Sequence, residues 1–314
     1  MWLRIGHSEP RRFYNAVIWV IRASQLALYL SAVLFATGVL AASFGLITWH
    51  LQLMTSALVS FYFSVMYLQL PGFINAAPSV KATLLVTSAF LISAAQILPY
   101  PLLPLALVYI VLHLKALRGA PNYYPNWITV SGALTAAVAA TPYEIIASFP
   151  LASVLTLMYR IDSSRGRKKF TVWGAGSIAA AHGAGFLLIK LGYFWGVALP
   201  LVVTSLAAPP KVRDVYGAGV VLGRVAMALG WLHHHFLYMG FAVVMAVLCV
   251  PYFLPSVVYR RVPKFSWENL AIALAAAALR LAGYIEIAAI SVLALIAYVA
   301  YKILREEKVP LKPP

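Results

Sequence analysis

WLHHHFLYMGFAVVMAVLCVPYFLP, residues 231–255, carries three consecutive histidines into an apolar run that ends at a proline. About twenty apolar residues follow the imidazoles, which is enough for a helix to cross a bilayer core of about 30 Å. Even neutral imidazole nitrogens need hydrogen-bond or metal partners inside a membrane. This stretch therefore predicts a membrane-spanning helix that begins with potential ligand groups.

The composition predicts a lipid environment for the whole chain of 314 residues as well. Hydrophobic residues make up 63% of it and charged residues 10%, whereas soluble domains carry about 25% charged residues. We predict an all-α fold, a polytopic membrane helical bundle that forms one domain over residues 1–314. The start of the chain is polar and basic and lacks the pattern of a cleavable signal peptide. The single cysteine, Cys249, excludes an intrachain disulfide and a cysteine metal cluster.

Apolar runs between charges and prolines predict about twelve transmembrane helices. They fall roughly at 23–46, 50–71, 80–98, 99–117, 126–140, 142–159, 170–190, 191–208, 216–232, 234–256, 266–283 and 285–304.

The basic residues support an even number of spans. All of them except Arg22, Lys190, Arg224 and Arg280 lie in alternate loops or in the termini. Under the positive-inside rule these loops and both termini are cytoplasmic, in a multi-pass protein of the cell membrane. The net charge of +16 is then explained by loops facing anionic lipid, so the expected partner is the bilayer and not nucleic acid.

With this topology, five of the seven histidines share one depth near the outer face. His50 opens the second span, His233, His234 and His235 open the tenth, and His182 lies in the outer half of the seventh. His7 and His113 lie elsewhere, and a bland structural role suits them. His233 and His235 would diverge by about 200° on a helix, so they would address opposite sides of the tenth span. That divergence does not suit a compact zinc site.

These motifs resemble heme-copper oxidase subunit I, a family with twelve spans and heme ligands at the outer ends of the second and tenth. The His-x-His opening of the tenth span is followed here by Gly240, Tyr252, Phe253 and Pro255. The second span runs from Trp49-His50 through Tyr67 to Pro71. The opening Trp49-His50-Leu51-Gln52-Leu53-Met54 is also similar to the Trp-His-x-His-x-Met motif of the NnrS family.

The sixth span departs from the oxidase pattern. TPYEIIASFP keeps the proline spacing with Pro142 and Pro150, but Thr141 stands at the copper-binding histidine and Ile145 at the cross-linked tyrosine. The paired histidines of span seven are missing, and only His182 could be a remnant. The resemblance thus implies a degenerate relative in which a copper centre and oxygen reduction are not expected, so we lean towards a protein that is not an enzyme.

The resemblance implies that His50 and His235 are axial ligands of a low-spin heme iron, with His233 facing a second heme. Arg280 and Lys190 would then be the cations nearest to heme propionates, although both could equally extend towards lipid headgroups. The implied function is electron transfer, or a heme- or nitric-oxide-related role, with other membrane or redox subunits as possible partners.

Other polar residues leave alternatives open. Arg224 lies within the ninth span and needs a buried partner or water; Glu144 and Glu286 lie near the outer zone, where a proton path and a solvated turn are both possible. A transporter would use these groups and would show broken helices and an inverted repeat. A cofactor-free scaffold subunit is a further alternative. A lipid or isoprenoid enzyme is disfavoured because Asp162 and Asp214 are the only aspartates.

Overall fold

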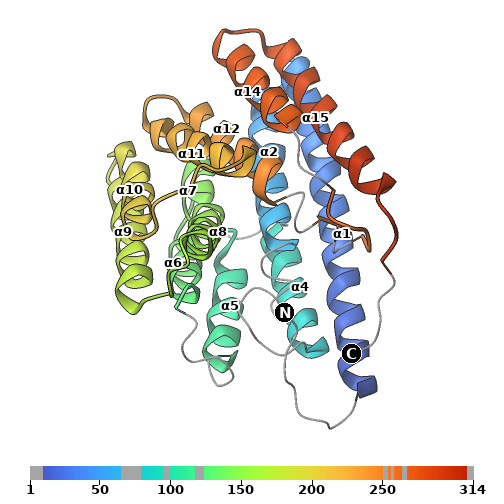
Figure 1. The fold of residues 1–314 in the computed structure, drawn as a ribbon, viewed down its shortest axis with the longest axis vertical. Coiled ribbons are helices and arrows are strands. Elements are labelled where there is room, and N and C mark those ends of the chain that lie inside the picture. Colours follow the sequence, from blue (N-terminus) through green and yellow to red (C-terminus); the bar gives the residue numbers. More distant parts are fainter. Residues whose placement is uncertain are drawn as a thin grey trace.

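The fold is entirely helical in a computed structural model (Figure 1). The structure describes residues 10–64, 79–94, 100–116, 124–249, 254–255, 258–263 and 267–309; side chains at 10–17, 113–116 and 248–249 are not described. Over these ranges no β-strand forms, and the one bridge pairs Arg260 with Lys308. The predicted all-α class is confirmed.

The helices follow the order of the predicted spans. They are α1 (Pro10–Ser43), α2 (Ile47–Tyr62), α4 (Val80–Ala94), α5 (Leu103–Ala116), α6 (Asn126–Ala136), α7 (Pro142–Ala147), α8 (Phe149–Arg165), α9 (Val172–Lys190), α10 (Ala198–Ala207), α11 (Val215–Ala228), α12 (His234–Val244), α14 (Trp267–Leu281) and α15 (Ile285–Arg305). Short segments extend three of them: the 3-10 turns η2 (Phe194–Val197) and η3 (Leu229–Trp231), and the π-helical η4 (Met245–Cys249).

Four helical segments are long and apolar enough to cross a membrane: Ile18–Ser43, Pro142–Arg165, Val172–Lys190 and Ile285–Arg305. Five other apolar helices have 10–17 residues within the described ranges. The predicted span 191–208 contains a 3-10 turn before α10, and Pro209-Pro210 follow where the helix ends, since proline disfavours helical backbone before it. The structure therefore supports membrane-crossing helices without fixing their number at twelve.

The helices form an elongated bundle (Figure 1). The long blue α1 lies beside the red α15 at one edge, and the yellow-green α9 and α10 form the opposite edge. α6 and α8 lie between these edges, and α8 is buried along most of its length. The second and tenth predicted spans, α2 and α12, approach each other in the upper half of the view.

Hydroxyl groups bond α1 to α2. Ser24 donates to the Ser64 carbonyl (2.5 Å), Ser31 to the Ala57 carbonyl (2.8 Å) and Ser60 to the Ala27 carbonyl (3.0 Å). All these serines are buried. Small side chains let helix backbones approach closely, and hydroxyl-to-carbonyl bonds are useful where no water competes. The tight turn at Gly45, with φ of 70°, closes the hairpin.

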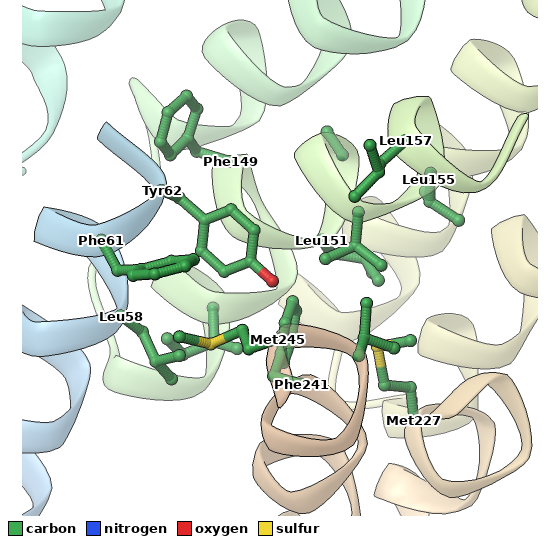
Figure 2. Packing of buried hydrophobic residues seen from close by; sticks show 14 of the residues in the cluster. Leu58, Phe61, Tyr62, Phe149, Leu151, Leu155, Leu157, Met227, Phe241 and Met245 are labelled. Carbon is green, nitrogen blue, oxygen red and sulfur yellow. The ribbon is translucent and has the colours of Figure 1, made fainter. Parts of the chain in front are cut away.

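The core lies where α2, α8, α11 and α12 meet (Figure 2). The Tyr62 ring of α2 contacts Phe241 of α12 edge-on, with ring centroids 5.8 Å apart. Leu151 of α8 and Met227 of α11 complete this packing. Glycines make the α11–α12 contact close: a Cβ on Gly240 would lie 2.7 Å from the Met227 nitrogen.

The sixth predicted span is broken. α7 ends at Ala147, Ser148 has non-helical backbone (φ −84°, ψ −103°), and α8 begins at Phe149 with Pro150 in its first turn. Proline lacks the N–H that would continue the preceding helix. The predicted span 142–159 is thus two helices, the second of which continues to Arg165.

The helix ends gather at two ends of the bundle. What we call the histidine end comprises the starts of α2, α7 and α12 and the ends of α9 and α14; the contacts that join them are given below. What we call the basic end has two parts. In the first, the end of α8 and the start of α11 are joined by the ion pair of Arg165 and Asp214 (2.9 Å). In the second, the loop after α12 and the chain after α15 are joined by the ion pair of Arg261 and Glu307 (3.1 Å).

Candidate functional site

His50 is held by the α1–α2 hairpin. Its Nδ1 lies 2.8 Å from the Gly38 carbonyl oxygen. A carbonyl can only accept, so Nδ1 carries the proton and Nε2 keeps its lone pair. Histidines that bind metals commonly donate their other ring N–H to a backbone carbonyl in this way. The structure therefore presents His50 in the tautomer of a metal ligand.

We predicted that His233 and His235 point to opposite sides of the tenth span. In the structure the two rings lie side by side instead. Their ring centroids are 5.0 Å apart. The error arises because His233 is the N-cap of α12, with extended backbone (φ −155°, ψ 128°), so the helical angle does not apply across it. Its Nδ1 accepts the His235 backbone N–H (3.2 Å), which leaves Nε2 protonated in the neutral ring.

His235 brings the two predicted ligand helices together. Its imidazole is half-buried and interacts electrostatically with Arg280, His233, His50 and His234. Its ring nitrogens make no hydrogen bond within the part of the chain that is described. We call the predicted residues His50, His233, His235 and Arg280 the imidazole cluster.

Arg280, near the end of α14, is the cation of this cluster. Among the described residues no carboxylate lies within ion-pair distance of it. Glu286, in the first turn of α15, is exposed and is not paired with it. An arginine with free donors next to several imidazoles favours an anionic group, because guanidinium matches carboxylate geometry.

His234 packs against aromatic side chains of α7 and η2. Its ring packs 4.5 Å from Tyr143 of α7 and 5.5 Å from Phe194 of η2, centroid to centroid. These aromatic contacts join the start of α12 to the start of α7 and to η2. The role of His234 is therefore packing, which the sequence pattern did not distinguish from ligation.

Lys190 does not join the imidazole cluster. Its ammonium lies 2.8 Å from the Glu144 carboxylate, which also accepts the Ala140 N–H at 2.8 Å. Thr141 caps α7 by accepting the Glu144 N–H (3.3 Å). These groups order the start of α7, so Thr141 has a structural role at the position where the oxidases place a histidine. Ile145 is buried in the core.

His182 lies apart from the imidazole cluster and bonds to the α7–α8 break. Its Nε2 lies 3.0 Å from the Ala147 oxygen and 3.1 Å from the Ser148 oxygen, so Nε2 donates; Nδ1 lies 3.1 Å from the Ser131 hydroxyl. Both ring nitrogens are engaged by the protein, as expected of a buried imidazole. The contacts favour a structural histidine over a remnant ligand.

The partner of Arg224 is Asp162, a residue that sequence reasoning did not assign to it. The pair is buried between α11 and α8, and Arg224 also donates to the Met158 sulfur (3.2 Å) and the Ser205 hydroxyl (3.2 Å). One feature of the sequence indicates this pair. A lone arginine in an apolar span needs an acidic partner, and Asp162 is one of only eight acidic residues in the chain.

The sequence indicates the hydrogen bond between His50 and the Gly38 carbonyl more clearly. Both residues lie six positions from Phe44, at the turn, so a tight antiparallel hairpin brings them level. Several predicted positions lie outside the described residues, among them His7, Tyr67, Pro71, Tyr252 and Phe253, and so does the side chain of His113.

Among the described residues, no three His, Cys, Asp or Glu side chains gather so that they could hold a metal ion by themselves. Comparisons with protein-family models, curated proteins and solved structures found no match.

Proposed function

We propose that the protein is a twelve-span membrane protein in which α2 and α12 bind heme between them. The proposal depends on one observation above all: His235 of α12 lies within electrostatic range of His50 of α2 and of Arg280 of α14. The membrane and the heme are supported by different features.

The outer surface supports a bilayer around the whole bundle. Exposed aromatic side chains lie near both ends: Trp49, Trp195, Trp231 and Tyr284 at the histidine end, and Trp173, Trp267 and Tyr301 at the basic end. Exposed aliphatic side chains lie between, on short helices as well as long ones, such as Leu107 of α5, Leu134 of α6 and Val202 of α10. Aromatic belts around an aliphatic band are typical of membrane proteins. Short spans can be accommodated by local thinning of the bilayer.

The donor set fits heme. Heme iron needs only two protein ligands, since the porphyrin supplies the rest, so a three-residue metal site is unnecessary. His50 would use Nε2, whose lone pair is free because Nδ1 donates to Gly38. His235 would be the second ligand, and Arg280 would pair with a heme carboxylate. His233 suits ligation less well, because its Nδ1 accepts a backbone N–H.

Two imidazoles on one iron leave no position for oxygen, and the chemistry that such a group supplies is one-electron transfer. The protein's own contribution would be to orient the His50 ring through Gly38 and to offer a cation at Arg280. We therefore propose an electron-transfer or nitric-oxide-related role in the cell membrane, with redox subunits as partners, and no copper centre.

An optical spectrum of the detergent-purified protein tests the site. We expect a sharp α-band in the dithionite-reduced protein, because bis-histidine heme is low-spin. His50→Ala and His235→Ala should each abolish the band. His234→Phe is the matched control, since it keeps the aromatic contact with Tyr143 and should keep the band.

Two results would reject this assignment. A protein that stays colourless after heme supplementation removes the heme proposal. A band that survives His235→Ala but disappears in His234→Phe excludes His235 as the ligand.

A transporter is the second candidate, favoured by the break between α7 and α8 and by the buried Arg224–Asp162 pair. Discontinuous helices and intramembrane charges are common at transport sites. Solute flux into proteoliposomes tests it: loss of flux in Asp162→Asn, with normal assembly, would favour transport. Absence of both heme and flux would leave a scaffold subunit.

A further inference from the structure

Two loops of the basic end are held against each other by Arg165, the last residue of α8. Its guanidinium donates to the two carboxylate oxygens of Asp214 at 3.0 and 2.9 Å, and to the Lys211 carbonyl oxygen at 3.2 Å. A bidentate contact between arginine and a carboxylate fixes geometry as well as charge. The loop between α8 and α9 therefore lies beside the loop between α10 and α11, and the Asp214 carboxylate is already paired.

Five further cations of these two loops are exposed and lack an acidic partner. Within the described part of the chain, no carboxylate lies within ion-pair distance of any of them. They are Arg167, Lys168 and Lys169 in the first loop and Lys211 and Arg213 in the second. We call them the two-loop surface. Because like charges gathered on adjoining loops raise the local positive potential, this surface attracts anions.

Arg167 has a backbone conformation that favours glycine. Its φ is 53°, in the left-handed region that costs free energy for residues with a Cβ. The turn ends α8, because the Arg167 N–H donates to the Ser164 oxygen (3.1 Å) and the Lys168 N–H to the Ser163 oxygen (2.8 Å). Glycine is the usual residue at this point of such a turn, so folding stability alone does not explain the arginine.

Exposed apolar side chains accompany the cations. Trp173, four residues after Lys169, is 86% exposed, and Val212, between Lys211 and Arg213, is 62% exposed. Tryptophan is enriched at the depth of lipid headgroups. A soluble anion would leave these side chains in water, whereas a lipid offers phosphate to the cations and less polar groups to the side chains beside them.

We propose that the two-loop surface binds the phosphate of an anionic phospholipid, with cations of both loops around one headgroup. Arginine pairs with phosphate through two parallel N–H groups, and lysine adds a point charge. Basic loops in general attract anionic bilayers. Here binding is assigned to these two loops in particular, and not to the net charge of the chain.

Native mass spectrometry of the detergent-purified full chain, with equal amounts of phosphatidylglycerol and phosphatidylcholine, tests the surface. We expect the native protein to retain phosphatidylglycerol preferentially. Lys168→Gln and Arg213→Gln, one in each loop, should each weaken its binding about five-fold, since one cation near a headgroup contributes about that factor. Arg167→Gly should weaken binding as much without lowering the thermal unfolding midpoint, because glycine suits the left-handed backbone.

Arg261→Gln is the charge-matched control, because it removes one exposed cation from the other part of the basic end. It should leave binding nearly unchanged at about 0.15 M salt, where charges more than about 8 Å apart are largely screened. Equal losses in Arg261→Gln and in the loop variants would overturn the proposal, because binding would then follow net charge.

Two other results would also overturn it. Equal retention of the two lipids would mean that phosphate charge is not recognised. Displacement of phosphatidylglycerol by millimolar inorganic phosphate would assign the surface to a soluble anion. Neither measurement uses heme, so a colourless protein would defeat the proposed function and leave this test intact.

Discussion

Arg224 and Asp162 test how a buried ion pair behaves within an apolar bundle. We expect Asp162→Leu to destabilise the protein by about 3–5 kcal/mol, because it leaves a guanidinium that cannot lose its proton. Arg224→Met should cost less, since a carboxyl left alone can take up a proton. Unfolding in detergent, followed by tryptophan fluorescence, measures both.

The double variant Asp162→Leu/Arg224→Met is the control for that pair. It should recover most of the loss, because two apolar side chains replace two paired charges. Equal losses in Asp162→Leu and in the double variant would show that the pair is not coupled.

Asp214, the N-cap of α11 at the basic end, predicts a pH dependence. Burial raises its pKa, but hydrogen bonds from Arg165 and from the Gly217 and Tyr216 backbone outweigh burial and lower it overall. A lowered pKa in the folded state stabilises the protein above the ordinary value of about 3.9, and this contribution is lost as the pH falls through the folded-state pKa.

The unfolding midpoint of Asp214→Asn should thus lie below that of the native protein at pH 6, and the difference should shrink as the pH falls through the folded-state pKa of Asp214. The effect should be at most about 1 kcal/mol, because the pair is partly exposed. A gap that stays constant with pH would exclude ionisation of Asp214 as the cause.

At single residues, the predicted topology placed His50, His235 and Arg280 at one depth because depth follows from position along a span, and this placement stays a prediction. The topology failed for His233 and could not separate His234 from its neighbours, because the capping backbone departs from helical geometry. The Arg224–Asp162 and Lys190–Glu144 pairs depend on helix neighbours, which span positions do not specify.

Among the helices, Gly240 sets the distance between α11 and α12. A Cβ at Gly240 would lie 2.7 Å from the Met227 nitrogen and 2.9 Å from the Gly223 oxygen, both backbone atoms that cannot move alone. Gly240→Ala should therefore destabilise the protein by about 1–3 kcal/mol. Chemical unfolding in detergent measures this.

Gly183→Ala is the matched control, on α9, where a Cβ meets nothing within 4 Å. It should be neutral or stabilise the protein by up to about 1 kcal/mol through helix propensity. Equal effects of the two substitutions would show that α11 and α12 do not depend on close approach.

The apolar runs of the sequence predicted where the helices lie, but they did not predict where each helix is interrupted. Hydrophobicity locates a span without locating the 3-10 turn of η2 or the break at Ser148, which depend on local hydrogen bonds. The carbonyls at that break are bonded by His182, and no spacing in the sequence indicates this contact.

For the whole molecule, the short helices decide the number of spans. Tyr193 and Arg213 flank η2 and α10 and are both exposed. In a Cys249→Ala background, Tyr193→Cys and Arg213→Cys should react with a membrane-impermeant maleimide from opposite sides of the membrane, with Arg213→Cys on the cytoplasmic side. Lys168→Cys, two helical segments away in the basic end, should match Arg213→Cys.

Labelling of Tyr193→Cys and Arg213→Cys from one side would show that α10 does not cross, and the twelve-span topology would be wrong. The composition predicted helices that could cross a membrane, and the orientation that the charges imply stays a prediction. The number of crossings could not be fixed in that way, because ten to seventeen residues suit a thinned bilayer and a buried segment equally well.

The hydroxyl-bonded α1–α2 hairpin has a consequence for the order of biogenesis. The contacts that orient His50 lie within residues 24–64, so they can form as soon as these two helices leave the ribosome. His235 is synthesised roughly 170 residues later. The first half of the proposed heme site would thus form early, and binding of the proposed heme would be a late step in the assembly of this protein.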